Sequence, residues 1–223
     1  MHRFPTSTER CEVLLCQEVT KKIPVRDEFL ILTNGKRSEK NYFEALRSEF
    51  KTIYKIKVKF MNDAPETLVS HAIDEKSKTN RVWCVFDKDQ FSKESIYQAI
   101  ALAKQYGIGI AFSNISFEVW LMDHFAKCEN EKTVDRLIKE LDSILQKHGY
   151  PKGYSKDDAD VFKSIFVPLL DDATHNADVV HQKRVLEHRR ERQDDNYPIC
   201  DWNSYTNVHK LVEAMKLQNK NKF

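Results

Sequence analysis

The segment Val82-Trp83-Cys84-Val85-Phe86-Asp87-Lys88-Asp89 carries the strongest structural signal in this chain. Its five apolar residues run into an acid-x-acid pair, which predicts a strand of a parallel sheet that is buried on both faces. Alternate strand residues point to one side, so Asp87 and Asp89 can both face the crevice at the carboxyl edge of the sheet. Carboxylates there suit a hard cation such as Mg²⁺. A strand followed by a polar turn is the simpler alternative.

Strand and helix patterns alternate on both sides of this segment. Ser38 and Ser92 are expected to cap two of the helices. Lysines alternate with apolar residues along 54–60, as is typical of a strand near a sheet edge. The alternation predicts an α/β fold, a mostly parallel sheet flanked by helices on both faces. The expected strands are 27–33, 54–60, 82–86 and 108–112. The expected helices are 39–50, one that starts at Pro65 and includes the apolar stripe to Ile73, and 92–107.

No further strand is expected beyond Ser113. Apolar residues recur at helical spacing through the rest of the chain, which predicts an α-helical C-terminal addition. The expected helices there are 132–148, 157–166, 168–192 and 205–217. We therefore expect an N-terminal arm at 1–26, an α/β domain at 27–126 and an α-helical C-terminal region at 127–223.

Composition narrows the class of protein without naming a partner. The chain has 223 residues, a net charge of +2, 31% charged residues and 41% hydrophobic residues, which is typical of a globular protein. No apolar run approaches the roughly 20 residues that span a bilayer, so we expect no membrane segment and a cytoplasmic location. The five scattered cysteines argue against a disulfide framework and a structural zinc site.

Polar residues follow three of the predicted strands. Asn34 and Gly35 follow the first, Asp87 and Asp89 the third, and Glu118 lies shortly after the fourth. The carboxyl ends of parallel strands meet at one edge, where Glu118 could add a third anionic group. A cation held there can polarise a phosphoryl oxygen and activate water, which is the basis of metal-assisted phosphodiester chemistry. As a residue of a first helical turn, Glu118 could equally stabilise the helix dipole.

Three segments in this order resemble the RloB family, and a fourth near the C-terminus agrees with its closing motif. These are Toprim-related proteins encoded near restriction systems and in abortive-infection operons. The resemblance extends over about residues 28–215. The segments are 34–43 (NGKRSEKNYF), 86–89 (FDKD), 113–125 (SNISFEVWLMDHF) and 203–212 (NSYTNVHKLV).

The resemblance implies a Toprim-like sheet, a divalent metal (Mg²⁺ or Mn²⁺) on Asp87, Asp89 and Glu118, and a nuclease-like role in phage defence. It also implies a nucleic-acid substrate, RNA such as tRNA or DNA, and an AAA- or ABC-type ATPase partner encoded nearby. The family usually has glutamate where this chain has Asn34, and an amide cannot take a proton at neutral pH. Glu39, one turn into the following helix, could substitute for that acid, or the protein could bind without cutting.

Several basic and polar residues near these strand ends are candidates for binding phosphate. They are Lys36, Arg37, Lys88 and Asn114. Solvated loop charges would give the same pattern, and helix capping would account for Asn114. The basic run 181–192 contains glutamates at helical spacing, so an exposed helix with ion pairs is expected rather than an RNA-binding face. His124 is expected to be a satisfied, partly buried histidine.

The sequence leaves three functions open. The first is a Mg²⁺-dependent nuclease subunit that an ATPase activates, and the second is a catalytically impaired sensor or scaffold with the same fold. A phosphatase acting on a small molecule is the third. No Gly-x-x-x-x-Gly-Lys-Ser/Thr loop is present, so ATPase activity would have to come from another chain. A homo-oligomer is also left open.

Overall fold

The computed structural model describes residues 27–51, 54–79, 81–88, 91–192 and 197–216. The arm predicted at 1–26, the acid Asp89 and the tail after residue 216 lie outside these segments.

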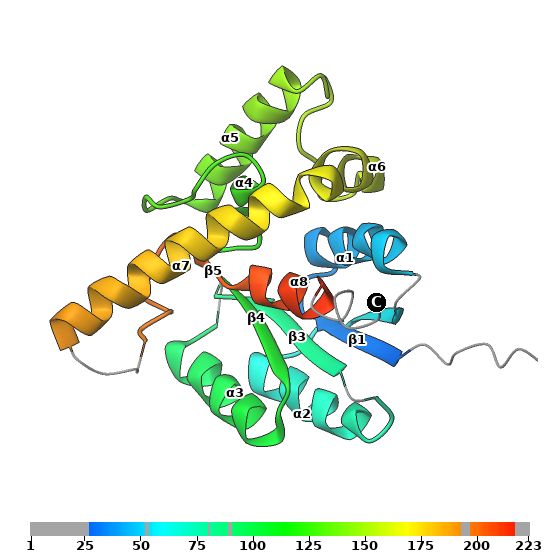
Figure 1. The fold of residues 1–223 in the computed structure, drawn as a ribbon, viewed down its shortest axis with the longest axis vertical. Coiled ribbons are helices and arrows are strands. Elements are labelled where there is room, and N and C mark those ends of the chain that lie inside the picture. Colours follow the sequence, from blue (N-terminus) through cyan, green and yellow to red (C-terminus); the bar gives the residue numbers. More distant parts are fainter. Residues whose placement is uncertain (1–26, 52–53, 80, 89–90, 193–196, 217–223) are drawn as a thin grey trace, which may run out of the picture.

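A five-stranded sheet with the order β2-β1-β3-β4-β5 forms the centre of the molecule (Figure 1). The first four strands pair in parallel and β5 pairs antiparallel to β4. The mostly parallel sheet and the edge position of the lysine-bearing strand are therefore confirmed. The strands are β1 (Asp27–Thr33), β2 (Tyr54–Phe60), β3 (Arg81–Asp87), β4 (Gly109–Asn114) and β5 (Tyr205–Thr206).

Helices cover both faces of the sheet (Figure 1). One face carries α1 (Ser38–Phe50) and α8 (Val208–Lys216), and the other carries α2 (Pro65–Lys76) and α3 (Lys93–Tyr106). The remaining helices form a layer beyond α1 and α8, as the predicted helical addition requires. They are α4 (Glu118–Asp123), α5 (Val134–Lys147), α6 (Ala159–Val161) and α7 (Leu170–Arg192), with a π-helical turn at Phe162–Phe166 and a 3-10 turn at Val167–Leu169.

The strand β3 is buried on both faces, as its unbroken apolar sequence predicts. Cys84 and Phe86 belong to the core under α2 and α3, whereas Val85 belongs to the core under α1. All three side chains are at most 1% exposed. Complete burial of a side chain as large as Val85 or Phe86 stabilises the fold by about 1.5–3 kcal/mol. The position of β3 in the sheet is therefore strongly determined.

The expectation that strands end at Ser113 is wrong. β5 extends the sheet beyond β4, and the hydroxyls of Ser113 and Thr206 lie 2.9 Å apart. Asn207 makes two hydrogen bonds with the Phe112 backbone. Its side-chain oxygen accepts from the Phe112 amide at 2.6 Å, and its backbone amide donates to the Phe112 carbonyl at 3.0 Å. A two-residue strand has no periodicity of its own, and these long-range bonds define it.

One of the two predicted helix caps is confirmed. The Ser92 hydroxyl accepts a hydrogen bond from the Ser95 amide at the start of α3. The cap predicted at Ser38 is wrong, because α1 begins at Ser38 itself and has no side-chain cap. The Ser38 hydroxyl donates instead to Glu118, at 3.3 Å. That bond joins the start of α1 to the start of α4.

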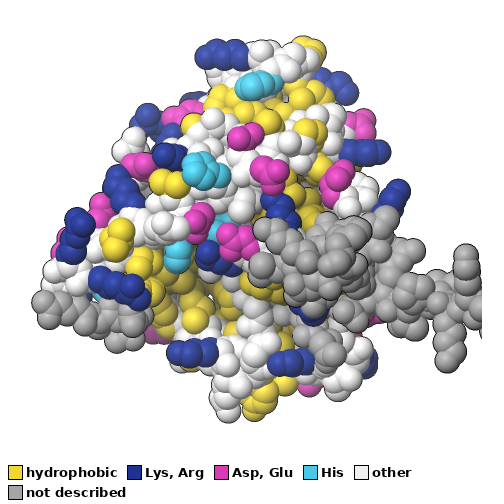
Figure 2. Space-filling model, viewed as in Figure 1, with side chains coloured by type: hydrophobic (Ala, Val, Ile, Leu, Met, Phe, Trp, Pro, Cys, Tyr) yellow, Lys and Arg dark blue, Asp and Glu magenta, His cyan; other side chains and the backbone are white. Residues whose placement is uncertain are grey.

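The surface and the cysteines agree with a globular chain. Cys84, Cys128 and Cys200 are free and buried. Charges of both signs are interspersed over the visible face in Figure 2, and Lys183 of α7 pairs with Glu129 at 2.6 Å. Within the described segments, no helix has the length and apolar character needed to cross a membrane. The division at residues 126 and 127 stays a prediction.

Candidate metal site at the carboxyl edge of the sheet

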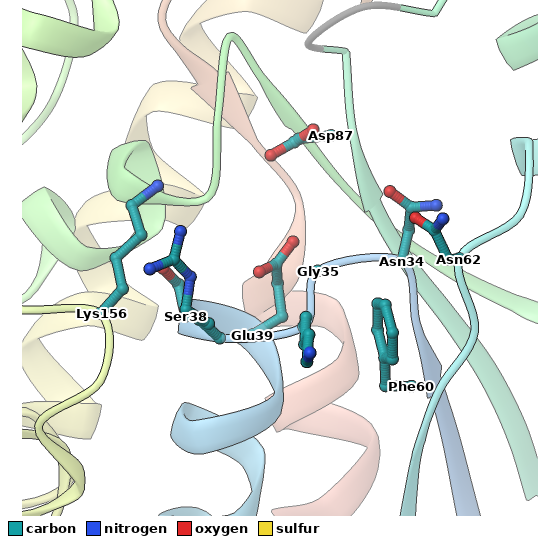
Figure 3. Close-up of a pocket in the computed structure, with 10 residues that line it drawn as sticks. Asn34, Gly35, Ser38, Glu39, Phe60, Asn62, Asp87 and Lys156 are labelled. Atoms are coloured by element: carbon teal, nitrogen blue, oxygen red, sulfur yellow. The ribbon is translucent and has the colours of Figure 1, made fainter.

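A polar cleft of about 490 Å³ opens at the carboxyl edge of the parallel strands (Figure 3). Its walls come from the loop after β1, the start of α1, the ends of β2 and β3, and a loop of the C-terminal region. The lining residues are Asn34, Gly35, Lys36, Arg37, Ser38, Glu39, Phe60, Asn62, Asp87 and Lys156. The predicted meeting of strand ends is therefore seen for the loop after β1 and for Asp87.

Backbone hydrogen bonds continue the sheet past the ends of its strands. The Asn34 amide donates to the Val85 carbonyl at 2.9 Å, and the Lys88 amide donates to the Ser113 carbonyl at 2.9 Å. These bonds hold the loops after β1, β3 and β4 side by side. Asp87, the last residue of β3, therefore has a fixed position at the rim of the cleft.

Glu39 faces Asp87 from the first turn of α1 (Figure 3). The Glu39 side chain is buried, and its carboxylate rests directly on Gly35. A Cβ atom added at Gly35 would lie 1.7 Å from Glu39 Oε2, which no side chain could tolerate without movement. Glycine at position 35 therefore creates the space for this carboxylate.

Glu118 lies beside the cleft and is 1% exposed. Its Oε1 atom accepts hydrogen bonds from Lys156 Nζ and the Tyr154 hydroxyl, both at 2.9 Å. Burial by itself would raise the pKa of Glu118, but the adjacent Lys156 charge and the hydrogen bonds outweigh burial and lower it. Glu118 is thus an ionised carboxylate whose charge is compensated by a lysine.

The other predicted site residues divide between the cleft and the interior. Lys36 and Arg37 line the cleft, and Arg37 pairs with Asp157 at 3.2 Å. Asn34 also lines it, and its side-chain amide donates to the Asp63 carbonyl. Asn114 is 1% exposed and instead donates to the backbone carbonyls of Ile199 and Cys200, at 3.1 and 2.9 Å.

Lys88 and His124 lie away from the cleft lining. The Lys88 backbone ties β3 to β4, as described above. His124 is buried: its Nδ1 lies 3.0 Å from the Trp120 carbonyl and its Nε2 lies 3.1 Å from the Tyr42 hydroxyl. A satisfied histidine in the core is the role predicted from the sequence.

Comparison with known proteins identifies the family. The family model described as RloB-like protein matches residues 29–215, which is most of the chain. The chain belongs to the RloB-like family. No curated protein and no solved structure matches this RloB-like chain.

The donor atoms of the cleft fit a hard divalent cation better than a soft one. Carboxylates of Asp87 and Glu39 face each other there, with the Asn34 amide beside them (Figure 3). Within the described segments no group of three His, Cys, Asp or Glu residues could by itself enclose a metal ion. Mg²⁺ is usually held by one or two carboxylates together with water and substrate phosphate, and this RloB-like site offers those carboxylates.

Several residues in or beside the cleft were not anticipated from the sequence of this RloB-like chain. Asn62 could have been found, because it follows β2 as Asn34 follows β1. Lys156 and Tyr154 could not, since they lie in a loop without periodicity, far along the chain from the strands they approach. Only the packing of the C-terminal helices brings that loop to the cleft.

Proposed function

We propose that this chain is the metal-dependent, Toprim-like nuclease subunit of a cytoplasmic phage-defence module, cleaving RNA or DNA when a partner ATPase activates it. The observation that carries the proposal is the pair Asp87 and Glu39, which face each other across a cleft at the carboxyl edge of a parallel sheet. Membership of the RloB-like family supports the nucleic-acid substrate and the partner ATPase.

In this proposal, different residues of the cleft bind the metal, accept a proton and bind the phosphate backbone. Asp87, together with Asp89 two residues further along the chain, would hold Mg²⁺ or Mn²⁺, which would supply polarisation of a phosphoryl oxygen and activation of water. Glu39 takes a proton from the attacking water as the water oxygen bonds to phosphorus. The bond from phosphorus to the leaving oxygen breaks, and that oxygen takes a proton from solvent. Lys36 and Arg37 attract the phosphate backbone into the cleft.

The test is cleavage by the purified chain together with the ATPase encoded beside it. Labelled tRNA and plasmid DNA are incubated with Mg²⁺ or Mn²⁺, and with EDTA as the control. We expect metal-dependent cleavage of one polymer. Turnover of nucleotides without cleavage of either polymer would instead identify a small-molecule phosphatase.

Replacing the proposed base should slow cleavage strongly. We expect Glu39→Gln to lower the cleavage rate by about a hundredfold, a typical contribution of general acid–base catalysis. Glu44→Gln is the matched control, because Glu44 lies on the same helix and pairs with Arg47 at the surface. Equal rates for the two variants would show that Glu39 takes no part in the reaction.

A side chain at position 35 should affect the cleavage rate only by displacing the Glu39 carboxylate. We expect Gly35→Ala to reduce cleavage by up to about tenfold, because the new methyl group forces the carboxylate off its rotamer at a cost of about 0.5–1.5 kcal/mol. The melting temperature should change little, since only the end of a flexible side chain has to move. In the Glu39→Gln background the same change should have no further effect, and additive losses would contradict this coupling.

The neutral amide of Asn34 favours a second candidate, a non-catalytic sensor or scaffold. Asn34 is bonded to the Asp63 carbonyl and occupies the position where the family usually has glutamate. In the nuclease, with Glu39 as base, we expect Asn34→Glu to change the rate by less than about threefold. A silent parent protein that Asn34→Glu makes active would identify the scaffold.

A further inference from the structure

Lys156 is the only cleft-lining residue that the C-terminal region contributes within the described segments. It reaches the cleft on the side opposite Asn34 (Figure 3). Its side chain is 36% exposed and lines the cleft. Loop lysines are usually solvated and mobile, and a lysine held at a fixed place in a cleft requires an explanation.

Three hydrogen-bond donors converge on one oxygen of Glu118. Lys156 Nζ and the Tyr154 hydroxyl each lie 2.9 Å from Oε1, and the Ser38 hydroxyl lies 3.3 Å from it. The Tyr154 and Ser38 hydroxyls are also 3.1 Å apart. Because a carboxylate oxygen has two lone pairs, Oε1 is fully used by these donors and is not available to a cation.

The hydroxyl of Tyr154 keeps its proton in this arrangement. Burial raises the pKa of Tyr154, and the negative charge of Glu118 raises it further. Tyr154 is therefore a permanent donor to Glu118, and the carboxylate remains ionised beside Lys156. The charge of Glu118 holds the Lys156 ammonium group in place. An ammonium group has three N–H donors, so one bond to Glu118 leaves two N–H groups for a ligand.

We propose that Lys156 binds a phosphate oxygen of the nucleic-acid backbone, and that Glu118 and Tyr154 are positioning residues that hold it at the cleft rather than ligands of the metal. The inference rests on the proposed function and assigns the substrate contact of the same site. It also makes the C-terminal region part of the site, because the sheet and α1 alone do not supply the Lys156 ammonium group.

Binding of an oligonucleotide without metal tests the first half of the proposal. A labelled single-stranded RNA is titrated by fluorescence anisotropy in EDTA, over a series of salt concentrations. We expect Lys156→Met to weaken binding by about tenfold and to reduce the salt slope by about one, as loss of one phosphate contact does. Lys163→Met, which removes an exposed lysine outside the cleft lining, should leave both unchanged.

Removing Lys156 alone leaves a buried carboxylate uncompensated, which can prevent folding. The double variant Lys156→Met with Glu118→Gln removes both charges and should show the same loss of RNA affinity as Lys156→Met. RNA affinity in the double variant equal to that of the parent, or a parent protein that binds no RNA, would overturn the proposal.

Binding of Mn²⁺, measured by calorimetry, tests the second half. We expect Glu118→Gln to keep the parent affinity for Mn²⁺, and Asp87→Asn to lose most of it. If Glu118→Gln loses Mn²⁺ as Asp87→Asn does, Glu118 is a metal ligand and our inference is wrong. Because neither measurement uses cleavage, the nuclease proposal can survive that result, and an inactive protein can still bind RNA through Lys156.

Discussion

Asp87→Asn is expected to reduce metal-dependent cleavage by about a thousandfold or more. Stabilisation of developing charge by a bound cation is worth several kcal/mol, and each 1.4 kcal/mol or so corresponds to a factor of about ten in rate. The substitution keeps the size of the side chain at the end of β3 and removes its charge. An amide is a weaker ligand for a hard cation, so most of the metal's contribution should be lost.

The matched control for this variant is Asp74→Asn. Asp74 is an exposed carboxylate of α2 that does not line the cleft, so its loss changes the net charge equally without touching the site. Both variants should melt within a few degrees of the parent. If Asp87→Asn retained more than about a tenth of the parental rate, the cation would have to be held without Asp87.

The sheet could be predicted because its information is local. The apolar run of β3, the alternating lysines of β2 and the helical stripes between the strands each follow from the periodicity of a short segment. The place where the strands end then follows from the parallel order, and so does the meeting of Asn34 and Asp87 in one cleft. This part of the site needed no knowledge of distant contacts.

The rest of the site depends on contacts between distant segments. Ser38 looks like an ordinary helix cap in the sequence, and the partner that draws it away, Glu118, is 80 residues further on. The positions of Lys156 and β5 likewise depend on packing between distant segments, which the periodicity of a short segment cannot predict. Glu118 has the right charge for a metal ligand, and only its bonds to Lys156 and Tyr154 indicate a different role.

Two of the buried histidines, His124 and His209, should make the fold sensitive to mild acid. Burial lowers the pKa of each from 6.5 to about 3. His124 is bonded as a neutral ring by Tyr42 and Trp120, whereas neither ring nitrogen of His209 has a hydrogen-bond partner in the described part of the chain. Asp178, 3.7 Å from His209 Nε2, opposes the lowering but does not reverse it.

The direction of the pH effect on stability depends on whether the folded or the unfolded state binds more protons. Between about pH 6.5 and about pH 3 each histidine is protonated in the unfolded chain and neutral in the folded one, so acid stabilises the unfolded state. Each histidine should cost about 1.4 kcal/mol per pH unit well below pH 6.5. Because each is only half protonated in the unfolded chain at about pH 6.5, the pair should cost about 3 kcal/mol between about pH 6.5 and about pH 5. That is a large part of the roughly 5–15 kcal/mol that stabilises a typical domain.

A variant that cannot titrate at these positions isolates the effect. In the double variant, His124→Gln keeps a donor and an acceptor for Trp120 and Tyr42, and His209→Leu replaces an unpaired ring by an apolar side chain. Asp123, a buried carboxyl whose pKa is raised by burial, acts in the opposite sense but is present in both proteins and cancels. We expect urea unfolding to show the parent losing about 3 kcal/mol relative to the variant between about pH 6.5 and about pH 5, roughly a few hundredfold in the folding equilibrium. Parallel pH profiles for the two proteins would show that the buried rings are protonated in the folded state, and that burial does not hold them neutral.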